Sequence, residues 1–366
     1  MEKCIYLKDS KQQLSFDSEE HIFPAGLGGI RKLPKGYVSD ECNNFFSGME
    51  TEFMRRSPLA IPRQFVGPGK RGKLNEKYAT KSDISLMSDE NSPIGIEFGY
   101  ISLGKPYSIP QFKIRLEGKM QFISDQSFGD ATAQYNNLMD KLEKFNNRYT
   151  IYEDERIDEN SFLIGYESKE NKWHIAFHKK DHGINVNEWI ERVIKSKKNI
   201  NNDDIEYGKM QPKVIQSMKI DLIDFHRVYA KIAFNFLAEL TNQEFVLDDQ
   251  FDPIRNWILH GGENEFVTLT GNGENFKSIS NLIPVPKSSH LVMIIQNRNH
   301  LFATISFYGG QFEVSVLLSD RFDGVFEQDG FICDWENRQE FRIFEYMLKE
   351  QEKKLKKIKE LQDVED

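Results

Sequence analysis

The sequence has little cysteine and no long apolar run. Its three cysteines, Cys4, Cys42 and Cys333, occur in 366 residues, which excludes a disulfide framework; an odd number of thiols is typical of a reducing compartment. No stretch approaches the roughly 18 consecutive apolar residues of a transmembrane helix, and the N-terminal MEKCIYLKDSKQQ lacks the apolar core of a signal peptide. We therefore expect a cytoplasmic protein with free thiols and no membrane partner.

The chain also lacks the net positive charge that is common in proteins that bind nucleic acid. Its formal net charge is -9, whereas affinity for phosphate comes mainly from Lys and Arg. The local distribution differs from the total, because residues 55 to 81 contain eight Lys or Arg residues and a single acid, Glu76. A cluster of this kind is more often a solvated surface than a binding site, so it needs a neighbouring motif before it indicates nucleic acid.

Length and composition indicate a folded protein of about two domains. The 366 residues are 39% hydrophobic and 29% charged, which fits a globular protein and excludes a largely disordered one. No internal repeat is present, so a solenoid is excluded.

Changes in composition divide the chain into four parts, which together predict an α+β fold. Residues 1–81 alternate short apolar runs with turns rich in Gly and Pro, and residues 82–94 are a polar linker. Residues 95–335 form an α+β domain whose role the sequence leaves open between sensing, targeting and partner binding. Residues 336–366 form a charged amphipathic helix, which makes a second copy of the chain or a regulatory protein an expected partner.

Periodicity predicts the elements of the second domain. Strand-like alternation occurs in YSIPQFKIRLEG, SFLIGYES and KWHIAFHKK, and helical spacing in DATAQYNNLMDKLEKF and VNEWIERVIKSK. The polar run KSKKNINNDDIEYGKMQ reads as a long loop. DLIDFHRVYAKIAFNFLAEL is the most helical segment and predicts a buried core helix. HLVMIIQN, LFATISFYGG and FEVSVLLSD then predict an antiparallel sheet.

The stretch EEHIFPAGLGG combines residues that suit phosphodiester hydrolysis. Histidine titrates near neutral pH and suits a general base, while carboxylate and amide oxygens suit Mg²⁺. Glu20 and His21 supply the first two groups, and Asn43 begins a predicted helix in SDECNNFFSGMETEF. Because neighbouring side chains of a strand point to opposite faces, Glu20 and His21 would share one site only at a twisted or irregular strand end.

Together with the segments around it, this stretch resembles the bacterial HNH endonucleases, the ββα-metal nuclease superfamily. The matching pieces are CIYL, EEHIFPAGLGG, LPKGYVSDECNNFFS and RQFVGPGKRGK, over roughly the first 75 residues. The family fingerprint opens with C-x-x-C, continues with an acid–His pair and a Pro before a Gly-Gly turn, and closes with C-x-x-C-N. The resemblance implies a metal-dependent nuclease domain over residues 1–81.

The resemblance also implies a role for each catalytic residue. His21 matches the general base that activates water, and Glu20 and Asn43 match the two protein ligands of a catalytic Mg²⁺ or Mn²⁺ ion. Pro24 and Gly28-Gly29 would shape the connecting turn. Six basic residues after the motif become candidate phosphate contacts that position DNA without reading its sequence: Arg55, Arg56, Arg63, Lys70, Arg71 and Lys73.

The structural zinc site of the family is incomplete in this chain. Cys4 and Cys42 match two of its four cysteines, but Leu7 and Ser39 stand in the other two positions. Two ligands cannot make a closed tetrahedral zinc site. We therefore expect no structural zinc, with Leu7 packing where a ligand would have been.

Two further motifs favour structural roles. His174, His178 and His182 recur every fourth residue, which on a helix would suit a metal, but KWHIAFHKK reads as a strand, so core or solvated histidines are favoured. Arg255 and Trp257 lie in FDPIRNWILHGG, a short predicted helix that ends at a Gly pair, and structural packing is the favoured interpretation.

We therefore expect a metal-dependent HNH endonuclease that hydrolyses DNA; a restriction-like or anti-phage role follows only by analogy. The alternative is a catalytically degenerate nucleic-acid-binding module or a partner-regulated interaction protein, and an RNA nuclease is a third hypothesis. The missing zinc ligands favour the degenerate module. The joint presence of Glu20, His21 and Asn43 favours the enzyme.

Overall fold

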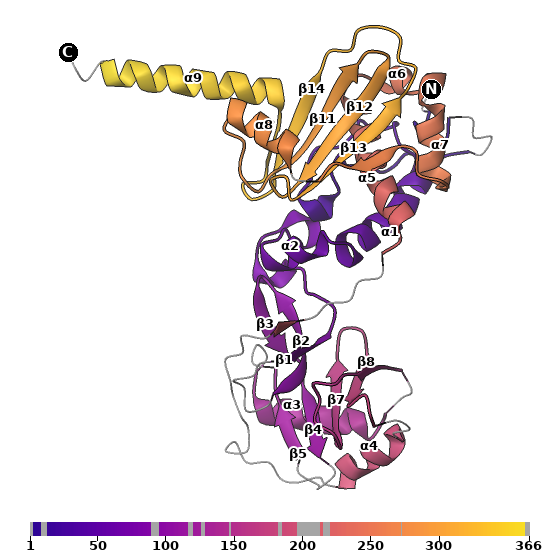
Figure 1. Cartoon of the computed structure of the whole chain (residues 1–366), viewed down its shortest axis with the longest axis vertical. Helices are drawn as coiled ribbons and strands as arrows, with labels where there is room; N and C mark the ends of the chain where they lie inside the picture. Colours follow the sequence, from indigo (N-terminus) through magenta and orange to yellow (C-terminus); the bar gives the residue numbers. More distant parts are fainter. Residues whose placement is uncertain are drawn as a thin grey trace. The chain divides into compact units, whose positions relative to one another are not determined.

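The chain forms two compact units in a computed structural model that describes residues 3–8, 13–88, 95–115, 120–125, 129–145, 148–181, 185–195, 213–214, 220–271 and 273–362. The composite unit contains Met1–Thr80 and Met218–Asp366, and the inserted unit contains Lys81–Ser217. Figure 1 shows the helices and strands of both units. No described helix is both long enough and apolar enough to cross a membrane.

The composite unit is built around a six-stranded antiparallel sheet and one long buried helix. The sheet has the order β10 (Val267–Leu269), β13 (Phe312–Ser319), β12 (His300–Phe307), β11 (His290–Asn297), β14 (Asp329–Asp334), β15 (Gln339–Arg342). The helices are α1 (Asp40–Arg56), α2 (Ala60–Phe65), α5 (Leu222–Leu240), α6 (Gln243–Val246), α7 (Asp252–His260), α8 (Glu274–Leu282) and α9 (Ile343–Gln362).

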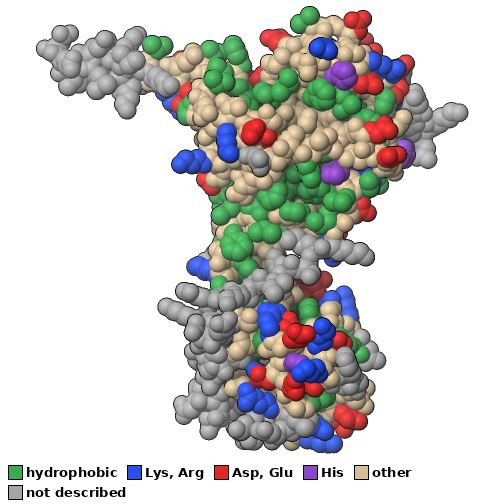
Figure 2. Space-filling view, viewed as in Figure 1, with side chains coloured by type: hydrophobic (Ala, Val, Ile, Leu, Met, Phe, Trp, Pro, Cys, Tyr) green, Lys and Arg blue, Asp and Glu red, His purple; other side chains and the backbone are tan. Residues whose placement is uncertain are grey.

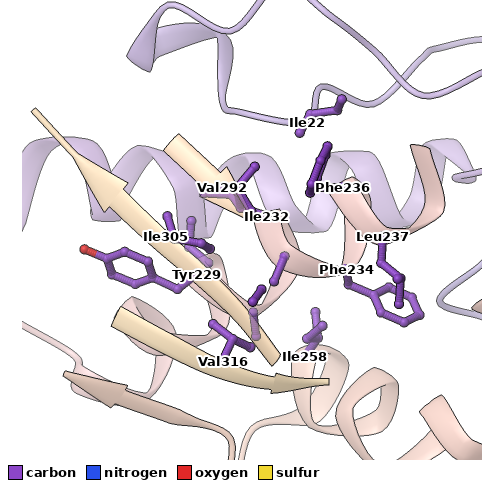
Figure 3. Close-up of a cluster of buried hydrophobic side chains, with 14 of the residues drawn as sticks. Ile22, Tyr229, Ile232, Phe234, Phe236, Leu237, Ile258, Val292, Ile305 and Val316 are labelled. Atoms are coloured by element: carbon purple, nitrogen blue, oxygen red, sulfur yellow. The ribbon is translucent and has the colours of Figure 1, made fainter. Parts of the chain in front are cut away.

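Helix α5 forms the centre of this unit because it is covered on all sides. Asp221 caps it by accepting hydrogen bonds from the backbone nitrogens of Ile223 and Asp224. All residues from Val228 to Ala238 are buried. The helix packs against α1 and against β11, β12 and β13. Figure 3 shows the resulting core, in which Ile22 from the N-terminal segment lies with Phe236 of α5 and with Val292 of β11.

The N-terminal segment contains an isolated β-bridge, a short turn and then a helix, with no assigned strand among its described residues. His21 and Lys32 form an isolated antiparallel bridge, and α1 follows at Asp40. Between the bridged residues, Pro24 precedes a short 3-10 helix (Ala25–Leu27) and Gly28 adopts a positive φ of 96°. A side chain on Gly29 would overlap the backbone oxygen of Phe23. The expected turn at Pro24 and Gly28-Gly29 is therefore present, and it requires glycine.

The first 80 residues obtain several hydrogen-bond partners from the end of the chain. The backbone oxygens of Ile5, Leu27 and Gly72 accept from Arg255, His290 and Arg338. The backbone nitrogens of Ile30 and Arg31 donate to the carboxylate of Glu340. Since buried backbone groups need partners, residues 1–80 are completed by residues that follow position 218.

The described residues of the inserted unit form two sheets and two helices. One sheet has the order β3 (Lys105–Ser108), β2 (Ile96–Ser102), β1 (Ser85–Ser88), β9 (Lys213–Val214). The other has the order β5 (Met120–Ile123), β4 (Gln111–Arg115), β7 (Ser161–Glu167), β8 (Lys172–Phe177), β6 (Tyr149–Glu153). Helices α3 (Ala131–Leu142) and α4 (Val186–Lys195) supply apolar residues to its core. On the face visible in Figure 2, basic and acidic side chains of this unit alternate.

The expected α+β class agrees with the presence of both helices and sheets. The division of the chain differs from the expected one. Strand β1 lies within the expected linker 82–94, whose residues 89–94 are outside the described part of the chain. The expected domain 95–335 is divided at Ser217, because α5 and the strands after it pack with residues 1–80. In the expected helix 336–366, β15 comes first and α9 begins at Ile343.

Candidate functional site

A buried ion-pair network lies directly beside the acid–His motif. The ammonium group of Lys231 on α5 contacts the carboxylates of Glu20 and Glu50, the latter on α1. The Lys231 side chain is fully buried, and those of Glu20 and Glu50 are 5% and 16% exposed. We call these three residues the ion-pair network.

The charges of this network depend on one another. Burial alone would lower the pKa of Lys231, but Glu20 and Glu50 raise it, so the ammonium stays charged. Burial raises the pKa of Glu20, and the attraction of Lys231 opposes this effect. Two carboxylates and one ammonium carry a net charge of -1 when all are ionised, so proton uptake by Glu20 would leave the network neutral.

The next residue, His21, faces a different environment. It is half-buried, whereas Glu20 is almost fully buried, as expected for neighbours that point to opposite faces of a strand. The His21 ring has no hydrogen-bond partner among the described residues. Burial lowers its pKa, and the cations Lys32 and Lys231 add to this effect. His21 is therefore a neutral imidazole at neutral pH, which is the state that a general base requires.

Asn43 is held close to the segment that precedes His21. Its side-chain nitrogen donates to the hydroxyl of Ser18 at 2.9 Å. Asp40 accepts from the backbone nitrogens of Asp17 and Ser18, both at 2.9 Å, and these bonds with that from the Ser18 hydroxyl lower its pKa well below the usual range. The structure therefore links Asn43 to the motif through Ser18 and not through Glu20.

This geometry does not fit the expected role of Glu20 as a metal ligand. A Mg²⁺ or Mn²⁺ ion needs carboxylate oxygens that no other cation occupies, and the Glu20 carboxylate is already paired with the Lys231 cation. Within the described residues, no group of three or more His, Cys, Asp or Glu side chains is arranged to hold a metal ion. In this arrangement, Glu20 is therefore not available to hold a metal ion for hydrolysis.

The two matching cysteines of the incomplete zinc motif lie together in the core. The sulfur atoms of Cys4 and Cys42 are 3.7 Å apart, and the backbone nitrogen of Ser39 donates to the Cys4 sulfur at 3.4 Å. Ser39 itself caps α1 by accepting from the backbone nitrogen of Cys42. Leu7 packs partly buried against the same core. The two non-cysteine positions thus serve helix capping and apolar packing.

Five of the six expected phosphate contacts are exposed, and one is not. Arg63 is 5% exposed and donates to the backbone oxygen of Met54 at 2.9 Å, so it stabilises α1 and α2 rather than meeting a phosphate. Arg56 is exposed but paired with Glu52 at 3.0 Å. The other four are exposed: Arg55, Lys70, Arg71 and Lys73.

Three of those four lie on a loop that is held in place by contacts with other residues. Lys70, Arg71 and Lys73, with the exposed Lys77, form what we call the basic loop. Arg338 of the C-terminal segment donates to the backbone oxygen of Gly72 at 2.9 Å, and Lys73 lies 4.2 Å from the centre of the Tyr78 ring. A side chain on Gly69 would overlap the backbone oxygen of Tyr78. Glycine therefore allows the loop to close tightly while its cations face solvent.

Of the histidine series outside the motif, His174 lies on strand β8 and His178 directly follows that strand. His174 is buried on β8, with its ring nitrogens 3.0 Å from the Tyr152 hydroxyl and 3.3 Å from a Glu167 oxygen. His178 is also buried and accepts from the backbone nitrogen of Lys180. His182 lies outside the described residues. The two described histidines are packing residues, as the strand pattern favours.

Arg255 and Trp257 belong to the structural frame of the composite unit. Arg255 is 2% exposed and donates to the backbone oxygens of Ile5 and Val246. Trp257 is 5% exposed and packs on Phe266. Helix α7 ends where Gly261 adopts a φ of 70°. The structural interpretation of this motif agrees with these contacts.

Comparisons with known proteins found no match: no protein-family model matches the chain, and neither a curated protein nor a solved structure matches it significantly. The likeness to HNH endonucleases therefore rests on the residues of the N-terminal segment.

Four residues of the site were missed from the sequence: Lys231, Glu50, Asn235 and Tyr6. Asn235 donates to the backbone oxygen of His21 and accepts from the Tyr6 hydroxyl. One signal was available in YAKIAFN, where Lys231 and Asn235 lie four residues apart within an otherwise largely apolar stretch. A charge and an amide on one buried face need polar partners from another element.

Proposed function

We propose that the composite unit binds nucleic acid through the basic loop. One observation carries this proposal. The four cations of the basic loop are exposed and have no ion-pair partner among the described residues, and a hydrogen bond from Arg338 holds the loop backbone in place. Fixed cations bind phosphate without reading base sequence. Arg55, exposed at the end of α1, adds a further cation to the same unit.

The inserted unit offers a contrast that supports this assignment. Several of its exposed cations have ion-pair partners: Lys179 pairs with Glu155, Lys180 with Glu159, and Arg115 with Asp158. Paired charges release fewer counterions when a polyanion approaches, so they contribute less to binding. The proposed nucleic-acid surface therefore belongs to the composite unit.

Hydrolysis is the second candidate function, and the state of His21 favours it. A half-buried, neutral imidazole whose ring has no hydrogen-bond partner within the described part of the chain is able to accept a proton from water. In this form the chain is a DNA endonuclease of the HNH type, with Mg²⁺ or Mn²⁺ as the proposed cofactor, and its use in restriction or in defence against phage depends on that activity. The burial of Glu20 argues against it, so binding without cleavage is the stronger proposal.

Binding is tested by titrating labelled duplex DNA and RNA with the full chain at several salt concentrations. Four phosphate contacts give a slope of log K against log salt of about -3.6, which is roughly a 150-fold loss of affinity between 50 and 200 mM salt. The variant Lys70→Ala/Arg71→Ala/Lys73→Ala should lower the slope to about -1. Lys179→Ala/Lys180→Ala is the control, since it removes exposed, paired cations elsewhere. Equal losses of affinity in both variants would show that the basic loop is not the nucleic-acid surface.

Cleavage is tested on supercoiled plasmid with Mg²⁺, Mn²⁺ or EDTA, beside His21→Ala. Nicking that needs metal and disappears in His21→Ala would establish the nuclease and assign its base. Binding without nicking by the wild type would favour the degenerate module. Nicking that survives in His21→Ala would exclude His21 as the base.

A further inference from the structure

We propose that Lys231 permanently supplies the cation of the Glu20–Glu50 carboxylate pair, so that the protein binds no divalent metal there until that ammonium is removed. The HNH resemblance places a metal beside Glu20, and the structure places a lysine there instead. The inference concerns only the ion-pair network, and its failure would leave the nucleic-acid proposal unaffected.

The carboxylates come from separate parts of the nuclease-like segment. Glu20 directly precedes the bridged His21, and Glu50 lies seven residues after Asn43 on α1. Two carboxylates that approach the same point in a buried region repel each other unless a cation lies between them. Both contact a single nitrogen, the Lys231 Nζ, so this nitrogen occupies the point where their fields add.

Lys231 is held in place by the buried helix that carries it. Its backbone lies in the middle of α5, between Ala230 and Ile232, both fully buried. One turn further along, Asn235 hydrogen-bonds to the backbone of His21. The Lys231 side chain is itself fully buried, so withdrawing the ammonium would disturb the close-packed core around it. The cation is therefore part of the fold.

Removal of the charge should change what the pair binds. In Lys231→Met, a thioether of similar length fills part of the space, and Glu20 and Glu50 are left with no cation between them. A divalent ion satisfies two carboxylates better than a monovalent one, and Mn²⁺ accepts oxygen ligands readily. Mn²⁺ also reports its own binding through electron paramagnetic resonance.

The experiment compares Mn²⁺ binding by the wild type, Lys231→Met and Glu20→Gln/Glu50→Gln/Lys231→Met, using paramagnetic resonance and thermal unfolding of the full chain. We expect no stoichiometric site in the wild type. Lys231→Met should bind one ion with at least tenfold higher affinity than the wild type, and its melting temperature should rise with Mn²⁺. The triple variant keeps the apolar replacement but lacks both carboxylates, so it should show neither effect.

Two results would overturn the proposal. A stoichiometric Mn²⁺ ion in the wild type that disappears in Glu20→Gln would show that metal and lysine do not exclude each other. A folded Lys231→Met that binds no more Mn²⁺ than the triple variant would show that the carboxylates make no cation site. If Lys231→Met does not fold alone, Mn²⁺ should restore its folding; failure of Mn²⁺ to restore it, while the triple variant folds, also refutes the proposal.

Discussion

Asn235 holds the backbone of His21 from within the core helix α5: its side-chain nitrogen donates to the His21 oxygen at 2.9 Å, and its side-chain oxygen accepts from the Tyr6 hydroxyl at 2.6 Å. Both Asn235 and Tyr6 are buried. One amide therefore connects α5 with two points of the N-terminal segment that lie 229 and 214 positions away in the chain.

Asn235→Ala should lower the free energy of unfolding by about 2–4 kcal/mol, because the His21 oxygen loses this donor and the Tyr6 hydroxyl keeps only a long contact of 3.4 Å to the Lys231 backbone oxygen. Tyr6→Phe, which removes one of the two bonds, should cost about 1 kcal/mol. Denaturant unfolding of both variants and of the double variant measures the coupling, expected at about 0.5–3 kcal/mol. Strictly additive effects would contradict the connected arrangement.

Burial of His290 predicts a loss of stability in acid. Its ring accepts from the backbone nitrogen of Tyr308 at 3.1 Å and lies 3.1 Å from the oxygen of Leu27, and burial lowers its pKa to about 3. Between the ordinary value of 6.5 and pH 3, the unfolded chain binds a proton that the folded chain does not. Stability therefore falls with decreasing pH by up to about 1.4 kcal/mol per pH unit from this residue.

The emission of Trp335, which lies beside His290, should report this transition. His290→Gln should flatten the profile between pH 6.5 and 4 relative to the wild type, although it also lowers stability at pH 7. An unchanged slope in the variant would mean that other groups cause the acid sensitivity.

Glu97 of the inserted unit predicts that stability changes with pH in the opposite direction. It is 1% exposed, accepts from the Ser108 hydroxyl at 2.5 Å, and burial raises its pKa to about 7. Between pH 4.5 and 7 the folded state retains a proton that the unfolded state releases, so stability falls as pH rises, by up to about 1.4 kcal/mol per pH unit. Above pH 7 the proton on Glu97 no longer contributes to the stability of the folded state.

Glu97→Gln should remove this dependence, because an amide is neutral at every pH. The emission of Trp173 and Trp189, which belong to the core of the inserted unit, provides the measurement. A variant whose stability still declines from pH 5 to 7 would contradict the assignment to Glu97.

The turn after the acid–His pair predicts a contrast between two glycines. Gly29→Ala places a methyl group on the backbone oxygen of Phe23, which cannot move aside as a side chain would, so the loss should be at least about 2 kcal/mol. Gly48→Ala, on the exposed face of α1 with no atom nearby, should instead stabilise by up to about 1 kcal/mol. Thermal unfolding separates these outcomes, and similar losses in both would refute the steric reason.

Local pattern was sufficient to predict the elements that carry their own periodicity. The helical spacing of Phe225, Val228, Ile232, Phe236 and Leu240 predicted α5, and the runs at 290–297 and 312–320 gave β11 and β13 within one residue. The assignment of these elements to a unit depended on contacts that no local pattern contains. Glu20 and Lys231 are 211 positions apart in the chain, so the partner of the acid was not visible from its own neighbourhood.

The predicted site was recovered in part for the same reason. Its turn and the order of its elements follow from Pro24, the glycines and the helix that begins after the Ser39 cap, all of which are local. The burial of Glu20 and Arg63 depends on which elements cover them, and these include residues far along the chain. Residue type alone favoured a metal ligand at Glu20 and a phosphate contact at Arg63.

The pairing of the first 80 residues with residues 218–366 has a consequence for synthesis on the ribosome. At about 5–20 residues per second, α5 emerges on the order of 10 s after the segment that carries Glu20 and His21. During that interval the nascent N-terminus lacks both the lysine that neutralises its acids and the helix that covers Ile22 and Phe46. A translational pause or truncation before residue 222 would therefore expose apolar surface to chaperones and proteases, whereas one after residue 240 would not leave that helix missing.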